Sequence, residues 1–252
     1  MGLTTVVATR YVTPLREGGS LPALMEADDD GLYVVKFRGA GQGVKALVAE
    51  LLAGELARRL GLCVPELVLV ELDPMLGRAE PDPEIQDLLD ASPGLNLGVD
   101  FLPGALSFDA ADPHPPVAPE LAAEIVWFDA LVANVDRTPR NPNLLLWHER
   151  LWLIDHGAAL YHQHAPGDLA AQARAPFPAI RQHVLLPHAG SILEAGERLA
   201  PHLSGELPAE LAALLPDDWQ ERPREAYAAW LEQRLAQPRV FAQEAEDARA
   251  RQ

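Results

Sequence analysis

Short apolar runs separated by polar turns fill the first third of the chain and predict β-strands. Residues 21–27 and 32–37 flank an Asp-Asp-Asp-Gly sequence that is typical of a hairpin turn. Val64–Leu72 is expected to form another strand, and a loop rich in proline and aspartate at 78–94 leads to the apolar segment Leu95–Leu102. This part of the chain therefore predicts a small β-rich unit.

One segment in this region has helical rather than strand periodicity. Val48, Leu52 and Leu56 recur every four residues and would form a core stripe along a helix over 44–60. Gly61 follows at once and can end the helix, because glycine readily adopts the left-handed conformation common at helix C-termini. The N-terminal part is thus expected to hold one main helix among its strands.

After the first third of the chain, the sequence pattern changes from one that predicts strands to one that predicts mainly helices. The segment 109–119 holds four prolines, which favours a loop or a boundary between two parts of the molecule. A helix is expected at 119–133, and the chain beyond about residue 165 is rich in Ala, Leu, Glu and Arg, which is typical of several helices. This order of elements indicates a two-lobed α+β chain, with one lobe over 1–102 and the other over 103–252.

Composition and charge argue against several classes of function. The 252 residues carry a formal net charge of -17, which argues against nucleic acid as a partner and disfavours anionic membrane surfaces. No apolar run approaches the length needed to cross a bilayer, and the N-terminus lacks the features of a secretory signal. The single cysteine, Cys63, has no partner for an internal disulfide, so we expect a cytoplasmic protein.

Polar residues gather around two apolar runs in the middle of the chain. The runs are separated by three polar residues, 148–150, and predict a β-hairpin. Antiparallel pairing around that turn would place Asp155 opposite Asn143. Folding of the hairpin would then bring Asp136, Asn141 and Asp155 to the same edge.

Two carboxylates and a carboxamide at one edge suit a magnesium ion, which prefers oxygen ligands and leaves room for water and phosphates. In kinases the catalytic-loop Asp accepts the proton of the substrate hydroxyl, and an Asn five residues later and the Asp of an Asp-x-Gly hold the metal ions. Asp136 and Asn141 have this spacing, and 155–157 reads Asp-His-Gly. Each feature alone is more often structural, because Asp and Asn beside proline are common turn formers. Their conjunction favours a kinase.

A kinase also needs a strand lysine for the phosphates and a helix glutamate to hold it. Lys36 lies in the strand expected over 32–37, and Glu50 lies on the predicted helix with the small residues Ala53 and Gly54 nearby. A face of small residues lets a helix approach a sheet closely, which would carry Glu50 towards Lys36. Solvated roles for both residues remain the alternative, since lysine is rarely buried unpaired.

These residues together resemble the HipA-like kinases and, more distantly, the phosphatidylinositol kinases, which share an Asp-Arg start to the catalytic loop. The resemblance rests on three stretches: Val34–Phe37, Glu50 through Pro65, and Asn134 through Gly157. It extends over about residues 15–160 and implies a protein-kinase-like bilobal fold. The N-lobe would be small and β-rich with one main helix, and the mostly helical C-lobe would contain a catalytic β-hairpin. Asn134 would brace the catalytic loop rather than act directly.

The resemblance also implies a role for each candidate residue. ATP and Mg²⁺ are the expected cofactors, with Lys36 on the phosphates and Glu50 as its partner. Asp136 would act as the catalytic base, and Asn141 and Asp155 would be the metal ligands.

Two further parts of an ATP site follow from the resemblance. The inter-lobe hinge is expected near 98–102, where the backbone would hold adenine on Asp100, Phe101 and Leu102. No G-x-G-x-x-G precedes the strand lysine, so the candidate phosphate loop consists of Gly18, Gly19 and Ser20. The chain is shorter than full HipA toxins, and we find no counterpart of their extra N-terminal part, so neither a toxin role nor a DNA-binding antitoxin partner is carried over from the resemblance.

The leading hypothesis is an ATP-dependent phosphotransferase that acts on a protein Ser or Thr hydroxyl, including its own. A small-molecule or lipid kinase on the same scaffold is the second hypothesis. The third is a nucleotide-binding pseudokinase or interaction module, and a helical scaffold that binds no ATP is the fourth. Acceptor choice is expected to depend on the variable loops 78–94, 103–119 and 158–185.

Overall fold

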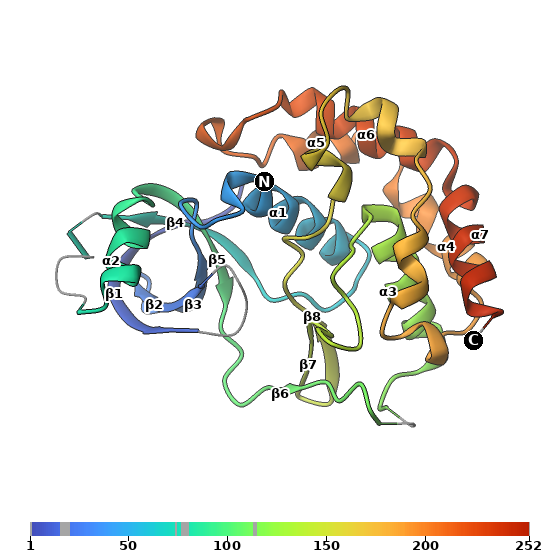
Figure 1. Cartoon of the computed structure of the whole chain (residues 1–252), viewed down its shortest axis with the longest axis horizontal. Coiled ribbons are helices and arrows are strands. Elements are labelled where there is room, and N and C mark those ends of the chain that lie inside the picture. Colours follow the sequence, from blue (N-terminus) through green and yellow to red (C-terminus); the bar gives the residue numbers. More distant parts are fainter. Residues whose placement is uncertain (1, 16–20, 74, 77–80, 113–114, 252) are drawn as a thin grey trace.

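The computed structural model joins a small β-barrel to a larger helical part, with one long helix between them (Figure 1). The structure describes residues 2–15, 21–73, 75–76, 81–112 and 115–251. Among these residues, no helix combines the length and the apolar character needed to cross a membrane. The arrangement is the mixed α+β architecture that the order of apolar patterns predicts.

The N-terminal strands close into a barrel in the order β1-β2-β3-β5-β4. Their bounds are β1 Thr5–Pro14, β2 Ala23–Ala27, β3 Leu32–Lys36, β4 Leu67–Leu72 and β5 Gly94–Asp100. Neighbouring strands pair antiparallel except β1 and β4, whose parallel pairing closes the barrel. The predicted hairpin between β2 and β3 is therefore confirmed.

Alternation along β3 decides which side chains face the barrel interior. Tyr33 and Val35 are buried in a core that also holds Met25 and Val70. Because strand side chains alternate between the two faces, Lys36 lies on the outer face of the barrel. The lysine thus points away from the barrel core and towards the rest of the molecule.

A second helix of the N-terminal part, α2 (Pro83–Asp90), packs against the barrel interior through Ile85 and Leu89. The prediction of a loop over 78–94 was wrong at this point. The helix begins with a strong local signal, because the side chain of Asp82 accepts a hydrogen bond from the amide of Glu84, 3.0 Å away, and proline occupies the first helical position.

The long helix α1 (Gly43–Arg59) lies between the barrel and the helical part (Figure 1). It confirms the helix predicted over 44–60. Its small-residue face approaches the sheet closely, because a Cβ on Gly54 would lie 2.7 Å from Leu67 in β4. Leu47 and Leu51 on the same helix are buried in the core shared with the C-terminal helices. The helix is thus packed on both sides.

The C-terminal part contains a small sheet and several helices. Strand β7 pairs with both β6 and β8. The bounds are β6 Leu106–Ser107, α3 Pro119–Val132, β7 Leu144–Trp147, β8 Arg150–Leu153, α4 Ile192–Leu199, α5 Leu207–Ala212, α6 Arg224–Ala236 and α7 Pro238–Arg249. Short 3-10 turns connect them at Tyr161–His164, Ala170–Arg174, Pro178–Gln182, Leu186–His188, Ala200–Leu203 and Asp217–Trp219. Several helices were expected from about residue 165, but α-helix begins only at residue 192, after a stretch interrupted by prolines.

The hairpin of β7 and β8 confirms the predicted pairing of the two apolar runs, but its register differs by one residue. The turn consists of His148 and Glu149, both with positive φ (47° and 60°), while Arg150 belongs to β8. Two-residue turns of this kind match the twist of the flanking strands. Asn143 therefore lies opposite Ile154, whose amide donates to its carbonyl at 3.1 Å, and not opposite Asp155 as predicted.

The 3-10 turn at Asp217–Trp219 holds the barrel from the C-terminal side. Trp219 is buried, and its indole nitrogen donates to the carbonyl of Leu95 in β5 at 3.0 Å. Arg38, which follows β3, pairs with Asp218. These contacts fix the end of the barrel next to Lys36 against the helical part.

Gly98 in β5 provides a test of the barrel packing. A Cβ at this buried position would lie 2.6 Å from Val70 and 2.8 Å from Val68. We expect Gly98→Ala to reduce the free energy of unfolding by about 1–3 kcal/mol, as overpacked cores do. Gly41→Ala is the matched control, because nothing lies within 4 Å of its Cβ, and it should change stability by less than about 0.5 kcal/mol. Urea denaturation measures both, and equal effects would contradict the packing.

Candidate active site

Lys36 joins three elements of the fold at the boundary between the barrel and the helical part. Its Nζ lies 2.5 Å from Glu50 Oε2 on α1 and 2.6 Å from Asp155 Oδ1, just after β8. The side chain of Lys36 is 14% exposed and that of Glu50 is 1% exposed, whereas that of Asp155 is 47% exposed. The cluster therefore opens to solvent on the side of Asp155.

The charges of this cluster depend on one another. Burial alone would raise the pKa of Glu50, but the charge of Lys36, together with His156, holds that pKa well below its usual range. Burial would likewise lower the pKa of Lys36, but Glu50 and then Asp155 raise it. Both groups are therefore ionised at neutral pH.

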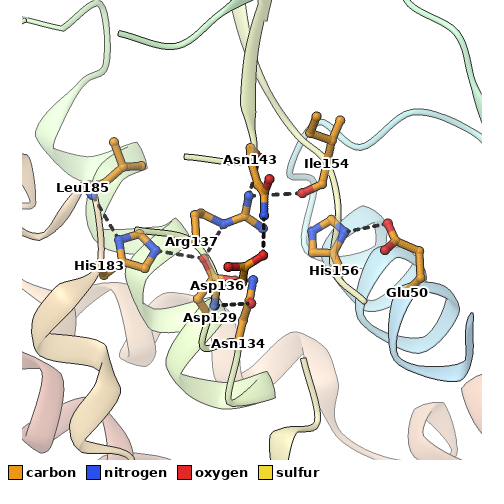
Figure 2. A network of polar contacts seen from close by, with 10 residues as sticks. All are labelled: Glu50, Asp129, Asn134, Asp136, Arg137, Asn143, Ile154, His156, His183 and Leu185. Atoms are coloured by element: carbon orange, nitrogen blue, oxygen red, sulfur yellow. Dashed lines mark hydrogen bonds and ion pairs between the residues drawn. The ribbon is translucent and has the colours of Figure 1, made fainter. Parts of the chain in front are cut away.

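His156 reinforces Glu50 from the opposite side. The histidine is fully buried, and its Nδ1 lies 3.6 Å from Glu50 Oε1 (Figure 2). Its ring meets Phe128 of α3 edge-on, with centroids 5.8 Å apart. The middle residue of the Asp-His-Gly sequence thus packs between α1 and α3.

Asp136 sits in the loop between α3 and β7. Its Oδ2 accepts hydrogen bonds from Asn141 Nδ2 at 2.7 Å and from Asn143 Nδ2 at 3.3 Å. The loop turns back on itself, because Thr138 and Asn141 exchange backbone hydrogen bonds of 3.1 and 3.0 Å. This turn returns Asn141 to the side of Asp136.

The pKa of Asp136 is raised, first by its partial burial and then by the negative charge of Asp155. The two carboxylates are therefore close enough to repel each other, and a cation between them would relieve the repulsion. Among the described residues, no group of three or more His, Cys, Asp and Glu side chains could by itself hold a metal ion. The donors present, two carboxylates and the amide of Asn141, fit Mg²⁺, which binds through few carboxylates and completes its shell with water and phosphates.

A second buried charge cluster lies beneath this loop and centres on Asp129 of α3 (Figure 2). Its Oδ2 lies 2.6 Å from Arg137 Nε and 2.8 Å from His183 Nε2, and its Oδ1 accepts from Asn134 Nδ2 at 2.9 Å. Burial alone would raise the pKa of Asp129, but Arg137 and His183 hold that pKa well below its usual range. Asn134 Oδ1 also accepts from the amide of Asp136 at 3.1 Å, which links this cluster to the loop.

The segment after Asp-His-Gly is held by Arg222. The guanidinium of Arg222 donates to the backbone carbonyls of Gln163, Ala165 and Gly167. Gln163 in turn donates from its side chain to the carbonyl of Lys45 at the start of α1, at 3.1 Å. The start of the loop expected over 158–185 is therefore tied to the helix that carries Glu50.

Five residues predicted from the sequence form two groups, and the members of each group contact one another. Lys36, Glu50 and Asp155 form one group, and Asp136 and Asn141 form the other.

The predicted hinge residues lie at the end of β5: Asp100 is its last residue, and Phe101 and Leu102 follow. The amide of Asp100 donates to the carbonyl of Glu66, just before β4, at 2.9 Å, and that of Phe101 to the carbonyl of Leu32 in β3 at 3.0 Å. Leu102 is buried at the point where the chain leaves the barrel. The candidate phosphate loop of Gly18, Gly19 and Ser20 lies outside the described residues.

Sequence reasoning missed several residues of the site. Asn143 was treated only as a strand position, although a second Asn so close to Asp136 is a local signal. Asp129 and His183 carry no such signal, because each is an isolated polar residue whose partners lie far along the chain. His156 enters the sequence analysis only as the middle residue of Asp-His-Gly.

The comparisons with known proteins bear on the family and the fold of this chain. A family model described as HipA-like kinase matches residues 9–184. Among solved structures, the crystal structure of a Helicobacter pylori proinflammatory kinase, CtkA, is similar with a TM-score of 0.57 and 14% sequence identity, over 94% of this chain and 97% of that one. No curated protein sequence matches significantly. At this identity the structural match shows a shared fold, and it extends over the helices beyond the family match.

Asp129 provides a stability test. We expect Asp129→Asn to lower the free energy of unfolding by about 3–5 kcal/mol, because it leaves Arg137 buried without its counter-charge. Asp90→Asn is the matched control, since Asp90 also lies at the C-terminal end of a helix but is exposed. Chemical denaturation at neutral pH measures both variants. A loss no larger than that of the control would contradict the buried ion pair.

The same pair predicts a dependence on pH. A carboxyl group whose pKa is lowered in the folded state stabilises the protein above its unfolded pKa of about 3.9, and this contribution is lost as the pH falls towards the folded value. The difference in unfolding free energy between the wild type and Asp129→Asn should therefore shrink as the pH is lowered from about 6 to about 3. A difference that stays constant over this range would show that the Asp129 pKa is not lowered.

Proposed function

We propose that this chain, which belongs to the HipA-like kinase family, transfers the γ-phosphate of ATP to a hydroxyl group of a protein Ser or Thr, its own included. Family membership supports a kinase-type phosphotransferase. The observation that carries the finer proposal is the pairing of Lys36 with both Glu50 and Asp155. A lysine held in this way has its ammonium fixed where nucleotide phosphates would lie.

The two parts of the fold would act as the lobes of the kinase. The first would cover residues 1–102 with a hinge near 98–102, and the second would cover 103–252. Because the amides of Asp100 and Phe101 already donate within the barrel, we assign the hinge hydrogen bond to adenine to the amide of Leu102. ATP would then lie with its phosphates near Lys36.

Each residue of the site has one task in this reaction. Lys36 binds phosphate oxygens, and Glu50 keeps its ammonium in place. Asn141 and Asp155 would hold Mg²⁺, which when bound would supply positive charge to offset that of the phosphates. The acceptor oxygen forms a bond to the γ-phosphorus while the bond to the oxygen bridging the β- and γ-phosphates breaks, and ADP leaves.

Asp136 takes the proton of the attacking hydroxyl. Its partial burial and the nearby Asp155 raise its pKa, which makes it a stronger base than an exposed aspartate. Asn141 and Asn143 donate to a single oxygen of this carboxylate and so leave the other oxygen for the acceptor. Orientation and proton transfer therefore depend on the same short loop.

Phosphoryl transfer can be tested directly. We expect the wild type, incubated with γ-labelled ATP and Mg²⁺, to transfer label to itself or to a protein of a cell lysate. Asp136→Ala should reduce the transfer by at least about 100-fold, the lower range for loss of a general base. Asp155→Ala should also reduce it strongly, because it removes a candidate Mg²⁺ ligand. Asp90→Ala, at an exposed position on α2, is the control and should retain wild-type transfer.

The outcomes separate the competing functions. Label that persists in both variants would contradict the assignment of the site. Label found in a lipid or small-molecule fraction instead of protein would favour the second kind of acceptor. ATP that raises the melting temperature without any transfer would indicate a binding module, since saturation at about a hundredfold excess over Kd stabilises by about 2.7 kcal/mol.

A further inference from the structure

Asp129 occupies an unfavourable position for a carboxylate. It is fully buried and lies in the last turn of α3, where the helix dipole repels negative charge. A carboxylate in such a place needs strong donors around it. The side chains of Arg137, His183 and Asn134 supply them.

The guanidinium of Arg137 links Asp129 to the β7–β8 hairpin. While Nε binds Asp129, Nη1 donates to the carbonyls of Asn143 and Ile154, the latter at 3.3 Å. Asn143 holds Asp136 through its side chain, and Ile154 directly precedes Asp155. One guanidinium therefore connects the loop that carries the base with the strand end that carries the candidate metal ligand.

His183 has a single tautomer in this arrangement. The amide of Leu185 donates to His183 Nδ1 at 3.1 Å, so this nitrogen carries a lone pair and the ring hydrogen sits on Nε2. Nε2 then donates to Asp129 Oδ2, 2.8 Å away. Burial, together with the charge of Arg137, lowers the pKa of His183 even though Asp129 acts to raise it, so the ring is neutral at physiological pH. His183 therefore orients the carboxylate without adding a second positive charge.

The segment around His183 touches the loop a second time. The amide of Val184 donates to the carbonyl of Arg137 at 3.0 Å. His183 and Val184 thus hold both the side-chain partner and the backbone of Arg137. They do so from a segment that lies beyond Gly157, where the last of the three stretches that carry the resemblance ends.

We propose that His183 is a positioning residue for phosphoryl transfer, acting through Asp129 and Arg137 to hold Asp136 in register with Asp155. This inference rests on the proposed function for its kinetic effect. Without the Nε2 donor, Asp129 Oδ2 keeps its contact with Arg137. It loses the hydrogen bond from His183, which fixes the orientation of the carboxylate. Arg137 then follows the carboxylate and no longer holds both hairpin carbonyls.

Kinetics of His183 variants test this role. We expect His183→Leu to lower kcat for Mg²⁺-dependent ADP formation by roughly 10- to 100-fold, the factor for one lost hydrogen bond to a charged group, with the KM for ATP changed less than about twofold. His183→Gln should recover most of kcat, because its amide nitrogen can take the place of Nε2. His202→Leu replaces an exposed histidine and is the matched control.

Hydrogen exchange tests the same claim without requiring activity. In His183→Leu, amides of residues 134–143 should exchange faster than in the wild type, whereas those of the barrel strands β2 and β3 should not change. A merely structural role would instead accelerate exchange throughout the helical part. Should His183→Leu fail to fold, His183→Asn replaces it, since its shorter amide cannot reach Asp129 and should give a lower kcat than His183→Gln.

The possible failures are distinguishable. A wild type that forms no ADP would contradict the proposed function, while the exchange measurement would still decide whether His183 holds the loop. An active wild type with His183→Leu at an unchanged kcat would overturn the positioning role. Unchanged exchange in residues 134–143 would overturn it as well.

Discussion

The ammonium group of Lys36 imposes the main constraint on this fold. A cation with so little access to solvent needs counter-charges within hydrogen-bonding distance. Glu50 and Asp155 supply them at 2.5 and 2.6 Å, and each comes from a different element. Helix α1 must therefore lie against the outer face of the barrel, and the hairpin end must reach the same point. The small residues of α1 and the contacts around Trp219 satisfy this requirement.

The cluster around Asp129 obeys the same rule, but with no access to solvent. Asp129 and Arg137 are each almost completely buried and cancel each other's charge. Asn134 and Asn143 then connect this closed pair to the partly exposed Asp136. The molecule thus combines a buried charge pair with two partly exposed carboxylates, those of Asp136 and Asp155, at the candidate site.

The features that could be predicted are those formed by residues within about twenty positions of one another in the sequence. The two apolar runs indicated the hairpin and helical periodicity indicated α1, and the structure contains both. The metal site expected from the spacing of Asp136, Asn141 and Asp155 stays a prediction. The one-residue error in register arose because Arg150 is polar yet belongs to β8, so that polarity alone misplaced the turn. The Asp82-Pro83 signal for α2 was local and could have been recognised. Asp129 and His183 could not, because the contact joins residues 54 positions apart and only tertiary packing brings them together.

The position of β5 within the barrel has a consequence for folding during synthesis on the ribosome. β5 lies between β3 and β4 although it follows both in the chain, so the growing polypeptide has an incomplete sheet with two open edges until about residue 100 has emerged. Open edges invite pairing with other chains. The contact between Lys36 and Asp155 spans 119 residues and forms later still. A fragment that ends before β5 would therefore keep exposed strand edges and be a target for chaperones and proteases. A fragment that ends between β5 and the hairpin would have a closed barrel, but Lys36 would have only Glu50 as a counter-charge.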